Sequence, residues 1–162
     1  MFSVTRLIDV PAGHLVRVAD SLQKLTADCG AHHAVVAPTL AGSRNGGDLL
    51  MHLRFERKDN WQSVAAEVET TLTDPAITRV NGADYHGAPT VIAERTPGTV
   101  YRTLLLRVEA DAGAEKVDKF EADLRALPGY VSSISAWQLS RPAHTVGATE
   151  WTHVFEQEFS DA

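Results

Sequence analysis

Residues 150–159, with the sequence EWTHVFEQEF, indicate the fold class of this chain. Aromatic side chains recur at alternate positions, so that Trp151, His153 and Phe155 share one face. A period of two over such a stretch is typical of a β-strand with one buried face. The residues that follow, 160–162, are typical of the start of a further helix. A histidine on an aromatic strand face is unusual, and it makes His153 the first candidate for function.

The sequence before this strand predicts the rest of a small α+β unit. Thr99–Val108 is expected to form a strand and Ala114–Leu127 a helix, which Pro128 ends. A second strand is expected at Tyr130–Leu139. Together with residues 150–159, these elements have the order βαββ, without a final helix and strand.

The first half of the chain predicts the same order in complete form. Strands are expected at residues 2–10, 33–40, 48–56 and 77–85, and helices at residues 11–29 and 59–72. The resulting order, βαββαβ, is the ferredoxin-like pattern. Two such units commonly pack sheet against sheet, because helices cover one face of each sheet. We therefore expect an α+β protein of tandem ferredoxin-like units, the second incomplete, in a dimeric α+β barrel-like arrangement.

A proline- and glycine-containing stretch at residues 87–99 is a plausible linker between the two halves. The predicted domains are therefore residues 1–90 and residues 99–162. In the first, the stretch LAGSRNGGDLLMHL, residues 40–53, runs from strand to strand. Asn45-Gly46 then indicates a hairpin turn with positive φ rather than a phosphate-binding loop, which would lead into a helix.

Composition and charge exclude several classes of partner. Twenty-one acidic against fifteen basic residues give a formal charge of −6, which argues against nucleic acid and anionic membranes. The N-terminus lacks the apolar core of a signal peptide or membrane span, and one cysteine, Cys29, permits no internal disulfide. We expect a cytoplasmic protein that does not bind membranes or nucleic acid. The histidines show no metal-ligand spacing, so no metal ion and no cofactor are expected.

Candidates for chemistry lie on the strand faces. His153 can exchange protons near neutral pH, and Arg102 interrupts an apolar alternation on the first strand of the second half. Arg102 either binds an anionic ligand or, near a strand end, reaches solvent or pairs with a nearby Glu. Arg6 in the first half is expected to reach solvent or to pair with a nearby Glu. His52 shares its face with polar residues and is expected to be exposed.

Residues 99–162 resemble the stress-responsive dimeric α+β barrel (Dabb) family. The resemblance rests on the strand LLLRV, the helix ending LRALPG, and a later strand with aromatic-Thr-His followed by F-S-D. Within the family, the pattern is similar to plant polyketide cyclases, which implies that His153 lies in a ligand cavity. The resemblance also implies a homo-oligomer and a barrel built from two units.

Three functions follow as alternatives. The first is a small cofactor-independent enzyme of cyclase, lyase or isomerase type, acting by acid–base chemistry on a hydrophobic aromatic or polyketide-like carbonyl compound. His153 and Arg102 would be catalytic, and Trp151, Phe155 and Leu104 would contact the ligand. The second is a non-catalytic ligand-binding or stress-associated barrel protein. The third is a cofactor-free or haem-binding monooxygenase.

Overall fold

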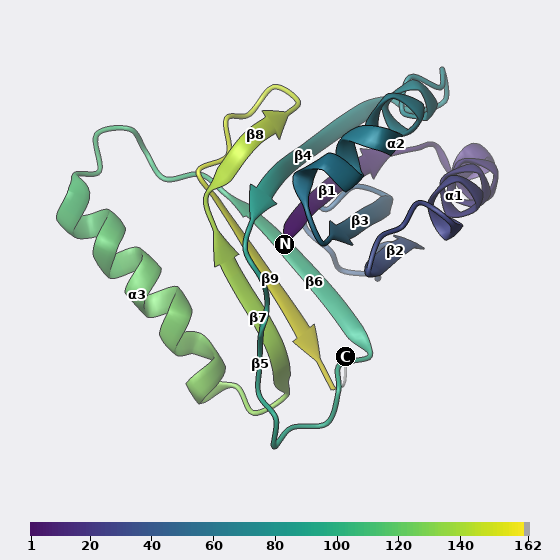
Figure 1. Cartoon of the computed structure of the whole chain (residues 1–162). Coiled ribbons are helices and arrows are strands. Elements are labelled where there is room, and N and C mark those ends of the chain that lie inside the picture. Colours follow the sequence, from purple (N-terminus) through teal and green to yellow (C-terminus); the bar gives the residue numbers. More distant parts are fainter. Residues whose placement is uncertain (161–162) are drawn as a thin grey trace. The chain divides into compact units, whose positions relative to one another are not determined.

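The computed structural model describes residues 1–160, which divide into two compact units (Figure 1). The first unit contains Met1–Tyr85 and Ala143–Thr149, and the second contains His86–Pro142 and the residues from Glu150 onward. The helix expected to start at residues 160–162 lies mostly outside the described residues.

The first unit confirms the predicted order βαββαβ. Its elements are β1 (Phe2–Asp9), α1 (Ala12–Ala27), β2 (His33–Pro38), β3 (Leu49–Phe55), α2 (Lys58–Thr71) and β4 (Arg79–His86). The strands pair in the order β2-β3-β1-β4, and β8 (Pro142–Val146) adds a fifth strand beside β4. Strands β2 and β3 form the predicted antiparallel hairpin, with His33 opposite Arg54.

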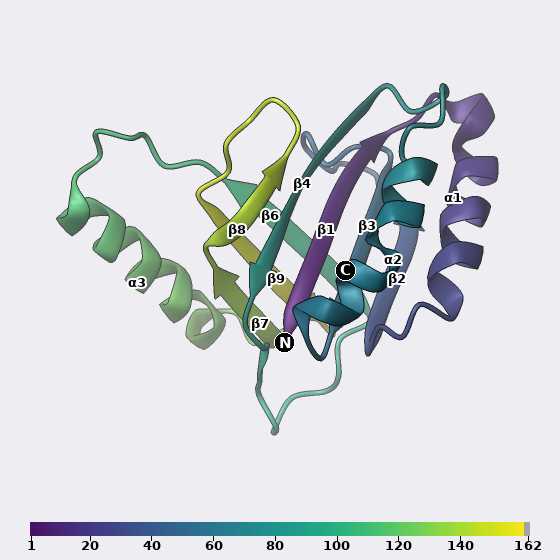
Figure 2. The same cartoon turned by 45° about the horizontal axis from the view of Figure 1, so that its top comes forward.

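Helices α1 and α2 lie on one face of the first sheet (Figure 2). The core is formed where their apolar stripes meet alternate residues of β1 and β3, because side chains of a strand point to opposite faces in turn. The fully buried members include Ile8, Leu22, Met51, Leu53 and Val68.

Polar side chains in this unit are more deeply buried than the sequence predicts. The expectation that His52 is exposed was wrong: its relative exposure is 0%. Its Nδ1 lies 3.0 Å from Thr5 Oγ1, which lies 2.9 Å from Tyr85 Oη. Arg6 is buried as well, because its guanidinium pairs with Asp84 at 2.7 Å instead of reaching solvent. Strand alternation indicated the correct face for each residue. It could not show the hydrogen-bond and ion-pair partners that compensate for the burial of these polar groups.

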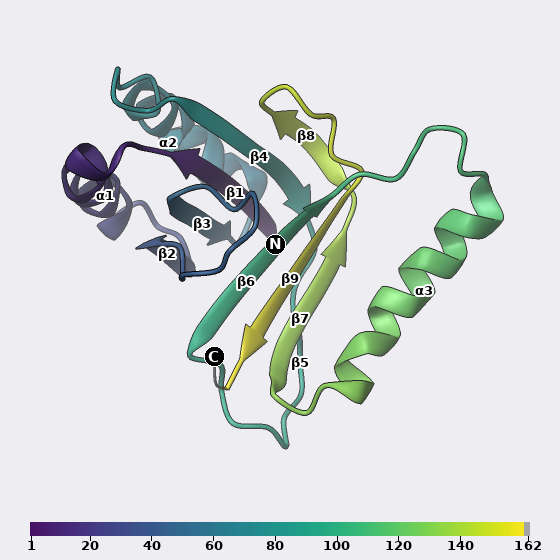
Figure 3. The same cartoon turned by 180° about the vertical axis from the view of Figure 1, so that it is seen from behind.

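The second unit contains the predicted βαββ core, with β6 (Val100–Leu106), α3 (Ala114–Tyr130), β7 (Ile134–Ser140) and β9 (His153–Phe159). Figure 3 shows β6, β9 and β7 side by side. A two-residue strand, β5 (Thr90–Val91), completes the sheet order β5-β7-β9-β6. Strand β9 therefore lies between β7 and β6.

Two short strands lie where the sequence predicts none. Strand β5 falls within the stretch interpreted as a linker, and its Thr90 pairs with Trp137 of β7. Strand β8 follows β7 directly along the chain but joins the sheet of the first unit. The chain thus passes from one compact unit to the other at residues 85–86, 142–143 and 149–150.

Candidate functional site

The register of β6 against β9 places the predicted site residues on one face of the second sheet. Arg102 lies opposite Gln157, Leu104 opposite Phe155, and Leu106 opposite His153. Directly opposed residues of an antiparallel pair point to the same side. Helix α3 lies against this side, because its Phe120 ring meets the His153 ring edge-on with centroids 5.4 Å apart.

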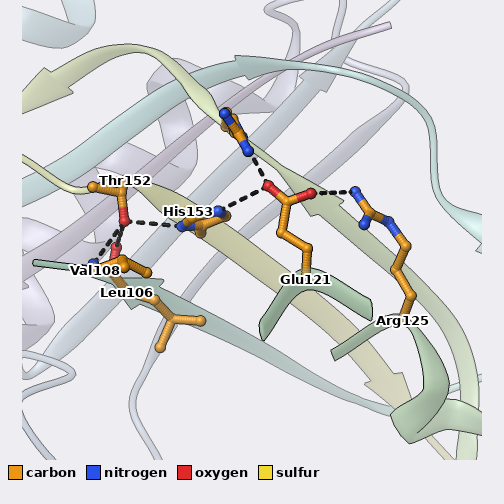
Figure 4. A network of polar contacts seen from close by, with 7 residues as sticks. Leu106, Val108, Glu121, Arg125, Thr152 and His153 are labelled. Carbon is orange, nitrogen blue, oxygen red and sulfur yellow. Dashed lines mark hydrogen bonds and ion pairs between the residues drawn. The ribbon is translucent and has the colours of Figure 1, made fainter. Parts of the chain in front are cut away.

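His153 is buried, with 2% relative exposure, and both of its ring nitrogens have polar partners (Figure 4). Nε2 lies 3.0 Å from Oε1 of Glu121 on α3. Nδ1 lies 2.9 Å from Oγ1 of Thr152, the preceding residue of the chain. The imidazole is therefore held in one orientation between a carboxylate and a hydroxyl.

Glu121 receives hydrogen bonds from three cationic or potentially cationic groups. Besides His153, its Oε1 accepts from Arg141 Nε at 2.7 Å and its Oε2 accepts from Arg125 Nη2 at 2.8 Å. Burial by itself raises the pKa of this carboxyl, but the hydrogen bonds from Arg141, Arg125 and His153 outweigh burial and lower the pKa to about 2. Glu121 is consequently a carboxylate at neutral pH.

The charge on Glu121 determines where His153 carries its proton. An ionised carboxylate can only accept hydrogen bonds, so Nε2 of His153 must be protonated. In the neutral imidazole, Nδ1 then has the lone pair and accepts the proton of the Thr152 hydroxyl. The basic nitrogen of His153 is thus Nδ1, and it faces Thr152.

The Thr152 hydroxyl connects His153 to the end of β6. Thr152 Oγ1 accepts the backbone N–H of Val108 at 2.9 Å and lies 3.2 Å from the carbonyl oxygen of Leu106. When Nδ1 becomes protonated, it donates to Oγ1, and the hydroxyl can donate to Leu106 instead. A proton can therefore be added to His153 without leaving any of these groups unpaired.

Arg102 and His153 share a face but do not meet. Arg102 lies four positions before Leu106, the partner of His153, which is a distance of roughly 13 Å along β6. Arg102 is exposed and donates to Gln157 Oε1 from Nε at 2.8 Å and from Nη2 at 2.5 Å. The predicted catalytic pair is thus two separate groups at opposite ends of one sheet face.

The three predicted ligand contacts lie near these groups in different environments. Phe155 is fully buried and packs its ring edge-on against Trp137, with centroids 6.3 Å apart. Leu104, opposite Phe155, is half-buried. Trp151 is half-buried just before β9, and its indole Nε1 is buried without a hydrogen-bond partner among the described residues.

Sequence reasoning missed Glu121, Thr152 and Gln157. Glu121 lies four residues before Arg125 on α3, a spacing normally typical of an exposed ion pair. Of these three residues, Gln157 could have been found from strand alternation. It shares the strand face of His153, and a glutamine among aromatic residues needs a polar partner.

No metal site accompanies this network. Within residues 1–160, no group of three or more His, Cys, Asp and Glu side chains is placed to hold a metal ion. Among the same residues, no helix has the length and apolar character needed to cross a membrane.

Comparison with known families and structures agrees with this architecture. Residues 100–162 match the model of the Stress responsive A/B Barrel Domain, which confirms the resemblance of residues 99–162. A comparison with curated protein sequences gave no match.

Solved structures share the fold across nearly the whole chain. An anthrone oxidase-like protein is 9% identical, with a TM-score of 0.64 over 99% of this chain and 73% of its own. A putative chlorite dismutase is 10% identical, with a TM-score of 0.57 over 99% and 79%. A mutant chlorite dismutase from Candidatus Nitrospira defluvii is 12% identical, with a TM-score of 0.54 over 99% and 77%. These likenesses establish an α+β fold of ferredoxin-like units.

Proposed function

We propose that this protein is a small cofactor-independent enzyme that performs acid–base chemistry of cyclase, lyase or isomerase type on a hydrophobic aromatic or polyketide-like carbonyl compound. The observation that carries the proposal is the 3.0 Å contact between Glu121 and Nε2 of His153, which holds the imidazole with its basic Nδ1 on the Thr152 hydroxyl. A carboxylate that orients a histidine and stabilises its protonated form is a recurrent arrangement for general base catalysis.

The proposed step removes a proton from the carbon next to a substrate carbonyl. That proton passes to Thr152 Oγ1 while the hydroxyl proton passes to Nδ1 of His153, and the C–H electron pair remains on the substrate as an enolate. Glu121 stabilises the resulting imidazolium. Return of the proton to another carbon gives isomerisation, and attack of the enolate on a second carbonyl, with protonation of the new alkoxide, gives ring closure.

The substrate body would lie along the sheet face between the two polar groups. Leu104 and Phe155 provide apolar surface there, and Trp151 provides an indole N–H donor. Arg102 is too far along the strand to stabilise an enolate formed beside His153, so we assign it to binding rather than to the proton transfer.

A non-catalytic ligand-binding protein is the second candidate. The burial of His153 favours it, because only 2% of this residue is exposed and both ring nitrogens are already hydrogen-bonded. In that case Glu121, His153 and Thr152 would dock α3 and β9 without transferring protons to a ligand.

A haem-binding monooxygenase, the third alternative, is not supported at His153. Axial ligation needs a free imidazole nitrogen directed at an open position, whereas Nε2 and Nδ1 of this residue face Glu121 and Thr152.

The proposal is tested by proton exchange on a simple aryl ketone, 1-(3,5-dihydroxyphenyl)ethanone. In D2O, the wild-type protein should accelerate deuterium incorporation into the methyl group, followed by proton NMR. His153→Ala should reduce this acceleration by about 100-fold or more. Thr152→Ser should retain most of it, and Thr152→Val should lose it.

The chain provides a matched control for the His153 variant. His32 also contacts a glutamate, Glu56, at 3.1 Å, but both side chains are more than half exposed. His32→Ala should leave the exchange rate unchanged. Equal rates for wild type and His153→Ala, with both proteins folded, would favour the non-catalytic alternative.

We also expect a homo-oligomer, because β6 is the terminal strand in the order of the second sheet and a strand at a sheet edge can pair with another chain. Sedimentation velocity over a hundredfold concentration range checks this. A single monomeric species throughout would contradict it.

A further inference from the structure

We propose that Arg102 and Gln157 form a recognition subsite for a carboxylate or phenolate group at the end of the sheet face remote from His153. The subsite rests on the proposed function only for the location of the reacting carbonyl. It adds a substrate class to that function: an elongated anionic compound rather than a neutral one.

The guanidinium of Arg102 is held in place without being neutralised. Gln157 Oε1 accepts two of its N–H groups, and the guanidinium lies over the Phe159 ring at 4.9 Å from the centroid. Partial burial lowers the pKa of Arg102, with no carboxylate to offset the effect, and the group stays charged. Among the described residues, no acidic side chain pairs with it.

Three other arginines of the described chain are placed differently. Arg6, Arg17 and Arg79 each contact the carboxylate of an aspartate at 2.6–2.7 Å, which balances their charge. Arg102 contacts a neutral carboxamide instead. Its remaining N–H groups are therefore available to an external anion, and a planar guanidinium suits a carboxylate in particular.

Gln157 supplies the second observation. Its relative exposure is 0%, and its Nε2 is buried with no hydrogen-bond partner among the described residues. Because Arg102 can only donate, it holds the amide oxygen, and the Nε2 hydrogens remain for another acceptor. A buried donor without an acceptor costs on the order of 1–3 kcal/mol, which a ligand oxygen would recover.

The same register sets the size of the ligand. Arg102 lies roughly 13 Å along the strand from the Leu106–His153 pair. The Leu104–Phe155 pair lies between them. A compound bound at both ends would have an anionic head, an apolar or aromatic middle and a carbonyl near His153. Since the protein has a formal charge of −6, anion selectivity would have to arise locally.

The test compares biphenyl-4-carboxylate with neutral biphenyl-4-carboxamide by isothermal titration calorimetry. Wild type should bind the carboxylate at least tenfold more tightly. Arg102→Gln removes the charge, and Gln157→Glu places a competing carboxylate on the guanidinium, so each should abolish this preference. Arg79→Gln, which alters an arginine already paired with Asp9, should preserve it.

The outcomes separate the subsite from the catalytic proposal. A carboxylate preference in wild type that is lost in Arg102→Gln would support the subsite even if no proton exchange were observed. Equal affinity of wild type for the two probes, no binding of either probe, or an unchanged preference in folded Arg102→Gln would overturn it.

Discussion

Glu121 is the side chain whose ionisation organises the His153 network, so it should also control how the fold responds to acid. Its pKa is lowered to about 2 in the folded chain, against an ordinary value of 4.5. A carboxyl with a depressed folded-state pKa stabilises the fold above its unfolded-state pKa. That contribution is lost as the pH falls towards the folded value.

Glu121→Gln should therefore flatten the dependence of unfolding free energy on pH between about 4.5 and 2. At pH 7, it should cost on the order of 2 kcal/mol, because charge-assisted hydrogen bonds to Arg125, Arg141 and His153 are lost. Urea unfolding at a series of pH values measures both effects. A variant with the pH profile of wild type would show that Glu121 is not ionised as described.

At this scale, the sequence indicated positions but not partners. Alternation placed His153 and Arg102 each on an apolar strand face, but it could not show how the β6–β9 register positions the two residues relative to each other. Glu121 could not be predicted as a partner of His153, because their hydrogen bond depends on how α3 lies across the sheet. Periodicity along a single element contains no information on that placement.

Helix α3 shows how an element can depend on one distant cation. Nη1 of Arg95, in the loop after β5, donates to the carbonyl oxygens of Pro128, Val131 and Ile134 at 2.7–2.9 Å. The last carbonyls of a helix have no partner within the helix. A cation at that end also interacts favourably with the negative end of the helix dipole.

Arg95→Gln should weaken the C-terminal turn of α3 and lower the unfolding free energy by about 1–3 kcal/mol. Hydrogen exchange should accelerate most at the amides near Val131. Lys119→Gln is a suitable control, because Lys119 forms only an exposed pair with Asp123 and should change stability by about 0.5 kcal/mol or less. Equal exchange in both variants would contradict the capping role.

In the loop between β2 and β3, the glycine that adopts positive φ against β1 is Gly47, which follows the predicted Asn45-Gly46 turn. Positive φ occurs at Gly42, Asn45 and Gly47, with values of 89°, 53° and 70°, and not at Gly46. A Cβ on Gly47 would lie 2.7 Å from the Ile8 carbonyl oxygen, whereas one on Gly46 would meet only Ser43 Cβ at 3.4 Å.

Gly47→Ala should consequently destabilise the first unit by about 1–3 kcal/mol, from backbone strain and the collision with β1. Gly46→Ala should have little effect. Thermal unfolding of the two variants provides the comparison, and equal melting temperatures would refute it. The hairpin itself was predictable from strand alternation, but the loop is longer than a tight Asn-Gly turn, which shifted the strained position by one residue.

In the whole molecule, β8 belongs to the sheet of the first unit, although the segments before and after it along the chain belong to the second unit. A strand of five residues that begins with proline has too little alternation to be recognised, which explains why two contiguous domains were expected. The ferredoxin-like order of each half was predictable because longer amphipathic elements produce clear periodicity.

Replacing residues 143–149 with a flexible Gly/Ser segment of equal length should destabilise the first unit, because β4 loses β8, one of its two neighbouring strands. Hydrogen exchange should accelerate along β4, while the β2–β3 amides keep more of their protection. The same replacement at residues 40–44, in the β2–β3 loop, is the control. Unchanged protection of β4 would show that β8 contributes nothing to this sheet.

The path of β8 also bears on how the chain folds during synthesis. A ribosome releases the chain from the N-terminus, so the four strands β1 to β4 are available once residue 86 has emerged. The fifth strand of that sheet arrives only with residues 142–146, after β5, β6, α3 and β7 have been made. The edge of β4 therefore stays unpaired, and can pair with other chains, while more than fifty further residues are translated. A nascent chain stalled within that interval would expose an incomplete sheet, a natural binding target for chaperones.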